Sequence, residues 1–330
     1  MGFEFNVEFE NMMETNGLKN VIILGHKNPD GDAAGSVLGI AHYIHVVYPQ
    51  YRVYPYLSEA LDKGPKILTL TDTLYDVFNL PELADKYAII QCDTATVKRI
   101  YGHELYKKAS CIMSLDHHAS NEYYGKINYV KISPACAQNV YEILDWNKWD
   151  EAVHPNAADY VYMGIIHDTS GLVRADLGTM TAIEHLMRLG VDHSYIMNTM
   201  KDATFEDLKR RAGFYKFVKR VWDGMIAYII VDQEMIRQYN FTIEDIHPFS
   251  SILRDCEDIR MAATLYEEKP GKWRCSFRSD GKWIDVNKLL TPLGGGGHAG
   301  AAGLRKTIDD PEKLWESIMD RVCALKDKED

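Results

Sequence analysis

A short apolar run at 111–115, Cys-Ile-Met-Ser-Leu, is followed at once by Asp116, His117 and His118. The run has the length and composition of a buried strand. Three polar side chains at the end of such a strand are costly to remove from water unless they bind something. Because one triplet of this kind is common by chance, its meaning depends on whether other segments end in the same way.

The predicted strand at 21–25 leads into a loop that holds His26, Asp30 and Asp32, and a helical pattern follows this loop. In open α/β folds, ligands bind at such turns, outside the carboxyl ends of the strands. Helix N-capping would explain one Asp in the loop. Two Asp and one His so close together are better explained by a divalent cation, which takes oxygen and nitrogen ligands.

Two more segments repeat the pattern. The predicted strand 87–92 runs into Asp93, and a later helical segment runs into Asp168. Further strands are predicted at 53–57 and 127–132. Strands that alternate with helices indicate an α/β domain with a doubly wound, mostly parallel sheet.

The length of 330 residues is large for one hydrophobic core and fits two domains. We predict a first domain at 1–200, a linker helix at 201–222 and a smaller α/β domain at 223–330. The linker is predicted because its charged sequence carries apolar residues at helical spacing. The active site is expected in the cleft between the two domains.

The second domain contains the block 293–303, which includes four consecutive glycines, Gly294 to Gly297. Such a run carries an entropic cost and permits close approach of backbone N–H groups to an anion. The small residues that follow predict the start of a helix, where anions bind. The alternative is a flexible linker, but its apolar and small neighbours are not typical of linkers.

Composition excludes several classes of function. A net charge of −11 argues against a sequence-independent grip on long nucleic acid, although a small positive pocket could still hold a short nucleotide. No apolar run approaches the ~20 residues that span a bilayer. The six cysteines form no Cys-x-x-Cys pair, and the amino-terminal segment lacks a signal-peptide layout. These features predict a cytoplasmic protein with reduced thiols.

The polar residues that end the apolar segments form one candidate site. They are His26, Asp30, Asp32, Asp93, Asp116, His117, His118 and Asp168. Gathering so many acids at one sheet edge requires cations. Carboxylates and imidazoles without thiolates favour manganese or magnesium, with iron or cobalt as alternatives, over structural zinc. The number of ligands suits two ions, which together can promote phosphoryl hydrolysis.

The motifs His-Lys-Asn-Pro-Asp-Gly-Asp, Cys-Asp-Thr, Asp-His-His and His-Asp-Thr resemble those of the DHH phosphoesterase superfamily. The motif Gly-Gly-Gly-Gly-His-x-Gly-Ala-Ala-Gly resembles the DHH-associated carboxyl-terminal domain. The resemblance covers nearly the whole chain. Among relatives, it is closest to the nano-RNase and pAp-phosphatase group, bacterial oligoribonuclease-like enzymes.

The resemblance implies two metal ions, most often Mn²⁺, with Mg²⁺ or Co²⁺ as alternatives. The implied ligands are His26 and Asp30 for the first ion, Asp32, His117 and Asp168 for the second, and Asp93 as the bridge. It also implies that Asp116 orients a histidine and that His118 contacts the phosphate and donates a proton.

The resemblance further implies a grip on the substrate phosphate in the second domain. The implied residues are Arg278, Asn287, Gly296, Gly297 and His298. One departure from the family pattern is an extra residue between Asp168 and Arg174, which puts the role of Arg174 in question.

The implied function is hydrolysis of very short nucleotides: 3′-phosphoadenosine 5′-phosphate (pAp), linear dinucleotides such as pApA, and nano-RNA of about two to five nucleotides. A homodimer is compatible with the resemblance. Three other functions compete with this one. They are a non-catalytic nucleotide sensor, an exonuclease of the RecJ type that acts on single strands, and a family II inorganic pyrophosphatase.

Overall fold

In the computed structural model, the chain forms two compact units, Met1–Asp202 and Ala203–Asp330. The structure describes residues 3–61, 63–83, 85–148, 156–201, 204–246 and 248–326. Each unit has its own sheet and its own core.

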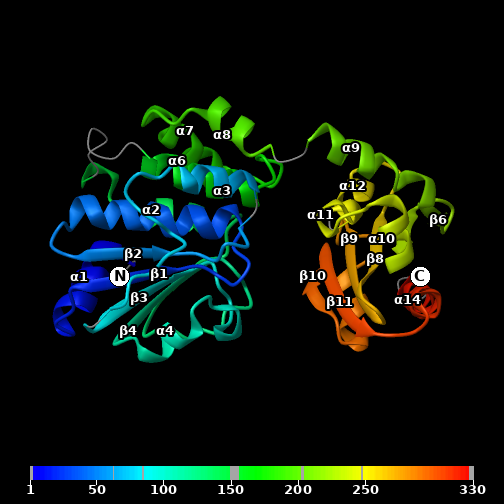
Figure 1. Cartoon of the computed structure of the whole chain (residues 1–330), viewed down its shortest axis with the longest axis horizontal. Coiled ribbons are helices and arrows are strands. Elements are labelled where there is room, and N and C mark those ends of the chain that lie inside the picture. The colour runs from blue at the N-terminus through cyan, green and yellow to red at the C-terminus, as the bar shows by residue number, and fades with distance from the viewer. Residues whose placement is uncertain are drawn as a thin grey trace. The chain divides into compact units, whose positions relative to one another are not determined.

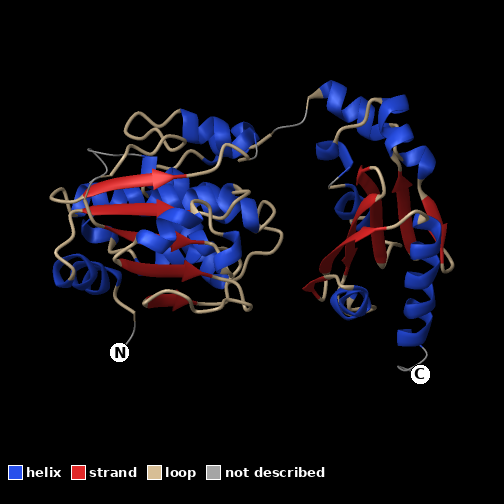
Figure 2. Ribbon diagram, turned by 60° about the horizontal axis from the view of Figure 1, so that its bottom comes forward, coloured by secondary structure: helices blue, strands red, loops and turns tan. Residues whose placement is uncertain are grey.

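The first unit is built on a five-stranded sheet in which every neighbouring pair of strands is parallel (Figure 2). The strand order is β2-β1-β3-β4-β5. The strands are β1 (Asn20–Leu24), β2 (Arg52–Tyr56), β3 (Tyr87–Cys92), β4 (Cys111–Asp116) and β5 (Ile127–Val130). β1 and β3 are buried along their whole length, which explains their continuous apolar sequences. The predicted parallel sheet is therefore confirmed.

Helices cover both faces of this sheet (Figure 1). The described helices of the unit are α1 (Phe5–Thr15), α2 (Gly31–Val47), α3 (Lys63–Leu70), α4 (His103–Lys108), α5 (Cys136–Ile143), α6 (Asn156–Asp168), α7 (Leu177–Arg188) and α8 (His193–Thr199). The larger core lies on the face covered by α2, α5 and α6. A smaller apolar cluster, which includes Ile22, Leu24 and Ile89, lies on the opposite face.

α2 and α6 pack unusually closely because both carry glycine at their contact. A Cβ atom at Gly35 would lie 2.4 Å from the carbonyl oxygen of Tyr160 and 2.8 Å from the amide nitrogen of Gly164. α2 begins directly after the β1 loop, and α6 ends at Asp168. This close contact therefore brings the polar residues at the start of α2 close to Asp168 at the end of α6.

The second unit is built on a mixed six-stranded sheet of order β10-β11-β9-β8-β7-β6. Its strands are β6 (Lys219–Val221), β7 (Ile226–Val231), β8 (Met261–Lys269), β9 (Lys272–Ser279), β10 (Gly296–His298) and β11 (Ala301–Thr307). Its helices are α9 (Phe205–Ala212), α10 (Gln233–Tyr239), α11 (Ile243–Ile246), α12 (Phe249–Arg254), α13 (Val286–Leu290) and α14 (Pro311–Lys326). β8 and β9 form an antiparallel hairpin around Gly271.

The predicted linker helix at 201–222 is wrong. α9 ends at Ala212, and the chain then forms β6, which pairs with β7 as an edge strand of the second sheet. α9 packs within the second unit, where the guanidinium of Arg210 lies 2.9 Å from the buried carboxylate of Asp245. The helical spacing was correct for α9, but it carried no information on the strand pairing that follows.

The glycine-rich block also differs from the prediction. Its residues form a hairpin of β10 and β11 instead of the start of a helix. Gly297 has φ +151°, and a Cβ atom there would lie 2.3 Å from the carbonyl oxygen of Ala301. Glycine at 297 is therefore required by the tight pairing of these two strands.

Candidate metal centre

The loop after β1 positions the first group of polar residues. Asp30 is the N-cap of α2, and its Oδ1 accepts hydrogen bonds from the backbone amides of Asp32 and Ala33 at 3.0 and 3.1 Å. Gly31 allows the loop to pass close to α6, because a Cβ atom there would lie 2.7 Å from the side chain of His167. Asp30 therefore serves as a helix cap and also lies in the cluster, with its Oδ1 4.0 Å from Nε2 of His26.

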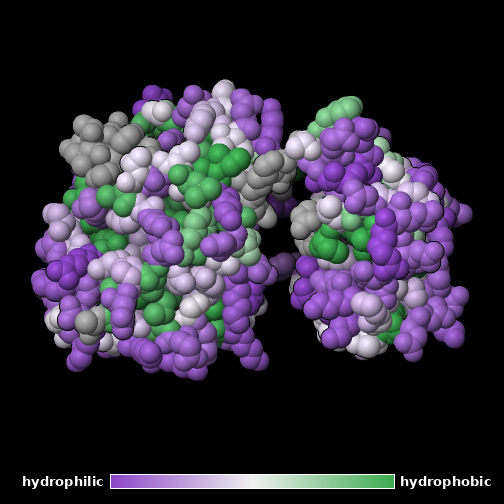
Figure 3. All heavy atoms as spheres, viewed as in Figure 1, coloured by the Kyte–Doolittle hydropathy of each residue, from purple (hydrophilic) through white to green (hydrophobic). Residues whose placement is uncertain are grey.

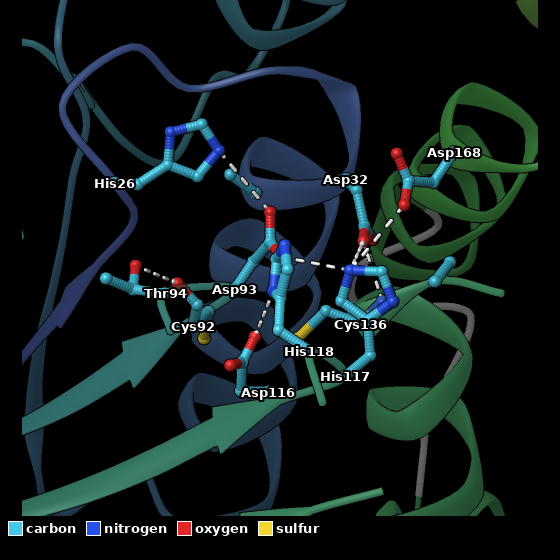
Figure 4. Close-up of polar contacts among 12 residues, drawn as sticks. His26, Asp32, Cys92, Asp93, Thr94, Asp116, His117, His118, Cys136 and Asp168 are labelled. Atoms are coloured by element: carbon cyan, nitrogen blue, oxygen red, sulfur yellow. Dashed lines mark hydrogen bonds and ion pairs between the residues drawn. The ribbon is translucent and has the colours of Figure 1, made fainter. Parts of the chain in front are cut away.

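Asp93 lies at the centre of the cluster (Figure 4). Its Oδ2 is 3.4 Å from Nε2 of His26, and its Oδ1 is 3.4 Å from Nε2 of His117. The residue has φ +49°, which is uncommon for a non-glycine residue and frequent at functional sites. Oδ1 is buried and makes no hydrogen bond with any described residue. Burial would raise the pKa of Asp93, but the imidazoles of His117 and His26 hold it below its usual range.

His117 presents one nitrogen to the acids and uses the other for orientation. Its Nδ1 lies 3.0 Å from the carbonyl oxygen of Ser133, so Nδ1 carries the proton and donates it to that carbonyl. Nε2 then faces carboxylate oxygens of Asp93 at 3.4 Å, Asp168 at 3.6 Å and Asp32 at 3.9 Å. This is the tautomer and orientation that a metal-ligating histidine requires.

Asp32 is fully buried, and both of its oxygens accept hydrogen bonds from the start of α5. The backbone amides of Cys136 and Ala137 lie 2.7 and 2.8 Å from these oxygens. Burial raises the pKa of Asp32 well above its usual range, and the charges of Asp93 and Asp168 raise it further. A divalent cation would relieve this repulsion.

Asp168 lies at the last residue of α6. Burial raises its pKa to about 6, with Asp30 as the largest charge contribution. The following loop has three successive residues with positive φ, Ser170, Gly171 and Leu172. Arg174 returns from this loop and donates a hydrogen bond to the carbonyl oxygen of Asp168. The extra residue of the loop is thus accommodated while Arg174 stays beside the cluster.

Asp116 points away from the acids and holds His118. Its Oδ1 lies 2.8 Å from Nδ1 of His118, and its Oδ2 accepts a hydrogen bond of 2.6 Å from Nδ2 of Asn121. The bond to Asp116 raises the pKa of His118 above its ordinary value. Asp116 is fully buried with both oxygens engaged, so it orients His118 and leaves Nε2 of that ring available.

Among the described residues, the donor atoms form four overlapping groups of three, and two of these groups match the ligand sets that the family resemblance implies. His26, Asp30 and Asp93 have donor atoms within 4.8 Å of one another, and so have Asp32, His117 and Asp168. Asp93, whose Oδ1 and Oδ2 face different histidines, links the sets. The structure therefore brings together all six residues that the sequence singled out as ligands. Their division between two ions stays a prediction.

Three residues near the cluster were missed by the sequence analysis. Asn121 supports Asp116, and a guanidinium nitrogen of Arg99 lies 3.5 Å from Nδ1 of His26. His167 forms a further group with Asp30 and Asp168. Asn121 lies in a loop and Arg99 in a short 3₁₀ helix, Val97–Arg99, and neither stretch has a periodic pattern. Only the closeness of these residues to the motifs in the sequence could have indicated them.

The residues expected to hold a phosphate lie in the second unit. In the strand register, Ala301 pairs with Arg278 on one side and with His298 on the other. Directly paired residues share one face of a sheet, so Arg278 and His298 lie on the same face. Gly296 and Gly297 belong to β10. Asn287 lies on α13, where its side chain accepts a hydrogen bond from Thr291.

This fold and this arrangement of ligands define a class of phosphate-ester hydrolases, and comparisons with known proteins agree. Residues 20–165 match the DHH family N-terminal domain, and residues 224–322 match the DHHA1 domain. The chain therefore carries a DHH domain followed by a DHHA1 domain, as its motifs indicated.

The particular relatives are as follows. The chain is 25% identical over 297 residues to the bifunctional oligoribonuclease and PAP phosphatase NrnA of Bacillus subtilis, which covers 88% of this chain and 91% of that protein. It is also 25% identical to a probable protein of the same name from Streptococcus mutans, over 90% of this chain and 93% of the relative.

A solved structure supports the fold. An exopolyphosphatase-related protein from Bacteroides fragilis matches with a TM-score of 0.80 at 19% identity, over 97% of this chain and 98% of that one. The described part of the present chain contains no helix that is both long and apolar enough to cross a membrane.

Proposed function

We infer that this protein is a metal-dependent phosphoesterase that hydrolyses very short nucleotides, namely pAp, linear dinucleotides such as pApA, and RNA of about two to five nucleotides. One observation carries the inference: two sets of carboxylate and imidazole donors meet at Asp93. The names of the two bacterial relatives give oligoribonucleotides and PAP as substrates of those proteins.

The residues fit two divalent ions. The set of oxygen and nitrogen donors without thiolate suits Mn²⁺, with Mg²⁺ or Co²⁺ as alternatives. The buried Oδ1 of Asp93 accepts no hydrogen bond from any described residue. Such ions, when bound, lower the pKa of water and neutralise charge that develops on a phosphoryl group. His26 and Asp30 would hold the first ion, Asp32, His117 and Asp168 the second, and Asp93 both.

The other residues would act on the substrate. Asp116 orients His118 through the hydrogen bond with Nδ1 of that ring. Nε2 of His118 would then contact a phosphate and protonate the leaving oxygen. In the second unit, Arg278 and His298 share one face of the sheet and would hold a terminal phosphate. The net charge of −11 disfavours long strands, which depend on many cationic contacts.

The test is a panel of substrates with purified protein and Mn²⁺: pAp, pApA, pGpG, and RNAs of about five and about 24 nucleotides, together with pyrophosphate. We expect turnover of the nucleotides and the short RNA, loss of turnover in excess chelator, and a lower kcat/KM for the long RNA. Equal or better turnover of the long RNA would favour an exonuclease of the RecJ type. Turnover of pyrophosphate alone would favour a pyrophosphatase. Binding of these ligands without turnover would identify a sensor.

A further inference from the structure

An arginine of the first unit, Arg99, lies beside the candidate metal centre. Its Nη2 atom is 3.5 Å from Nδ1 of His26. Nε2 of the same imidazole faces carboxylate oxygens of Asp93 at 3.4 Å and of Asp30 at 4.0 Å. His26 stands at one end of the cluster in Figure 4. This end of the acidic cluster therefore has a positive charge next to it.

The backbone that carries Arg99 is tied to the loop of His26. The amide of Lys27 donates a hydrogen bond of 2.8 Å to the carbonyl oxygen of Arg99. Ile100, the next residue, forms an antiparallel bridge with His26, and its side chain is fully buried in the smaller core cluster of this unit. These contacts hold the backbone of Arg99 beside the cluster, so only its side chain has room to reorient.

The guanidinium of Arg99 has no acidic partner among the residues that the structure describes. Its one side-chain hydrogen bond there is the contact with His26. The residue is exposed. Exposure alone does not distinguish it, because hydrophilic residues cover much of the surface that Figure 3 shows. Its position does, since this unbalanced cation lies next to a predicted metal ligand.

The contact with His26 is incompatible with metal binding by that histidine. A guanidinium has only N–H donors, so Nδ1 of His26 is the acceptor, and the proton of the neutral ring lies on Nε2. A histidine that binds a metal ion through Nε2 carries its proton on Nδ1 instead. Two donors would then face each other. Arg99, whose side chain is exposed, would turn to another acceptor.

The charges of a loaded centre make a phosphate the suitable acceptor. The two ligand sets contain four carboxylates, those of Asp30, Asp32, Asp93 and Asp168. Two divalent ions balance these four charges, so the loaded centre has no net charge that would attract an anionic ester. An arginine at its edge supplies that charge, and its planar fork of donors matches two oxygens of a phosphate.

We propose that Arg99 binds a non-bridging oxygen of the phosphate that is hydrolysed at the metal centre. This inference rests on the proposed function, and it assigns to the first unit a substrate contact separate from the grip expected at Arg278 and His298. Because Arg99 lies beside a metal ligand, its partner is the reacting phosphate itself. Its effect should therefore extend to every phosphate ester that the centre hydrolyses, whatever the rest of the molecule.

The kinetic test compares pAp with bis-p-nitrophenyl phosphate, which has only the reacting phosphate. Arg99→Gln removes the charge and keeps a polar side chain. We expect kcat/KM to fall about ten- to a hundredfold on both substrates, and the difference from wild type to narrow as salt is raised. Arg278→Ala should affect mainly pAp, so the two arginines give different patterns. Unchanged kcat/KM in Arg99→Gln would overturn the proposal.

The matched control is Lys98→Gln. It removes the same charge from the neighbouring exposed residue of the same 3₁₀ helix, Val97–Arg99. Both kcat/KM values should stay as in wild type. An equal fall in Lys98→Gln and Arg99→Gln would show that only the overall charge of this segment matters, and it would overturn the assignment to Arg99. Both side chains are exposed, so neither substitution disturbs a core.

A binding measurement separates contact with phosphate from support of His26. Calorimetry on the full chain measures Mn²⁺ binding first, and then binding of inorganic phosphate to the Mn²⁺-loaded protein. In Arg99→Gln, Mn²⁺ affinity should not fall, because the contact with Nδ1 of His26 opposes the metal-binding tautomer. Phosphate affinity should fall about tenfold. Weaker Mn²⁺ binding with unchanged phosphate affinity would overturn the proposal and make Arg99 a support of His26.

The same measurement distinguishes failure of this proposal from failure of the proposed function. If wild-type protein hydrolyses neither ester, the proposed function is wrong. The phosphate contact is then supported if Arg99→Gln weakens phosphate binding while Lys98→Gln does not. It is overturned if wild type and Arg99→Gln bind phosphate equally.

Discussion

Nε2 of His117 lies 3.4 Å from Oδ1 of Asp93, although the two residues follow different strands, β4 and β3. These strands are parallel neighbours in the sheet, so their carboxyl ends meet at one edge. The same carboxylate reaches His26, which follows β1, the other neighbour of β3. Asp93, which follows the middle strand β3, therefore contacts histidines that follow both neighbouring strands.

The first prediction concerns this carboxylate. Asp93→Asn keeps the shape of the side chain but removes the charge that links the two ligand sets. We expect the hydrolysis rate of pApA to fall by several orders of magnitude and Mn²⁺ affinity to fall with it. Single-turnover kinetics and calorimetry with Mn²⁺ measure the two effects. Near-normal turnover in this variant would contradict the role of Asp93 as a ligand that both ions share.

The second prediction separates orientation of His118 from metal binding. Asp116→Asn weakens the bond that holds Nδ1 of His118, while the ligand sets themselves are unchanged. Loss of an orienting partner typically costs about 10–100-fold in activity. We expect kcat to fall by this amount and Mn²⁺ binding to persist. If the variant instead loses its metal ions, Asp116 has a larger part in building the site than the hydrogen bonds indicate.

The third prediction tests the phosphate grip of the second unit. Arg278→Ala or His298→Ala should leave Mn²⁺ binding intact, because neither residue belongs to a ligand set. The loss of one charge-assisted hydrogen bond, about 1.5–3 kcal/mol, should lower kcat/KM for pAp about ten- to a hundredfold. Turnover of bis-p-nitrophenyl phosphate, which lacks the extra phosphate, should fall less. An equal fall on both substrates would place these residues in the catalytic step.

The fourth prediction concerns stability. Burial raises the pKa of Asp159 to about 6, and the charge of Asp192 adds to this shift. Because the folded state raises this pKa, the ionised form of Asp159 destabilises the fold. The penalty is absent below about pH 4, grows as pH rises and is complete above about pH 6. Asp159→Asn should therefore raise Tm at about pH 8 by roughly 2–4 °C and have little effect near pH 4.

Thermal melts at both pH values measure this effect. The matched control is Asp320→Asn, at an exposed position on α14, which should shift Tm little at either pH. If Asp159→Asn changes Tm equally at both pH values, its effect comes from packing and the ionisation argument is wrong.

The sequence alone determined the parallel sheet of the first unit and indicated the residues of the candidate metal centre. Both follow from local signals. Short apolar runs predict buried strands, and in a parallel sheet the polar residues after those strands meet at one edge whatever the details of packing. His26, Asp93 and His117 were therefore identifiable before any contact was known.

Only the tertiary structure decided features that depend on pairing between distant segments. The glycines at 294–297 could precede a helix or form a hairpin, and their pairing with β11 selects the hairpin. The helical spacing after 201 could not reveal that β6 joins the edge of a sheet. Arg274 and Arg305 carry no motif, and they meet because β9 and β11 pair in one register. Register is set by the fit of whole strands, so no single stretch of sequence encodes it.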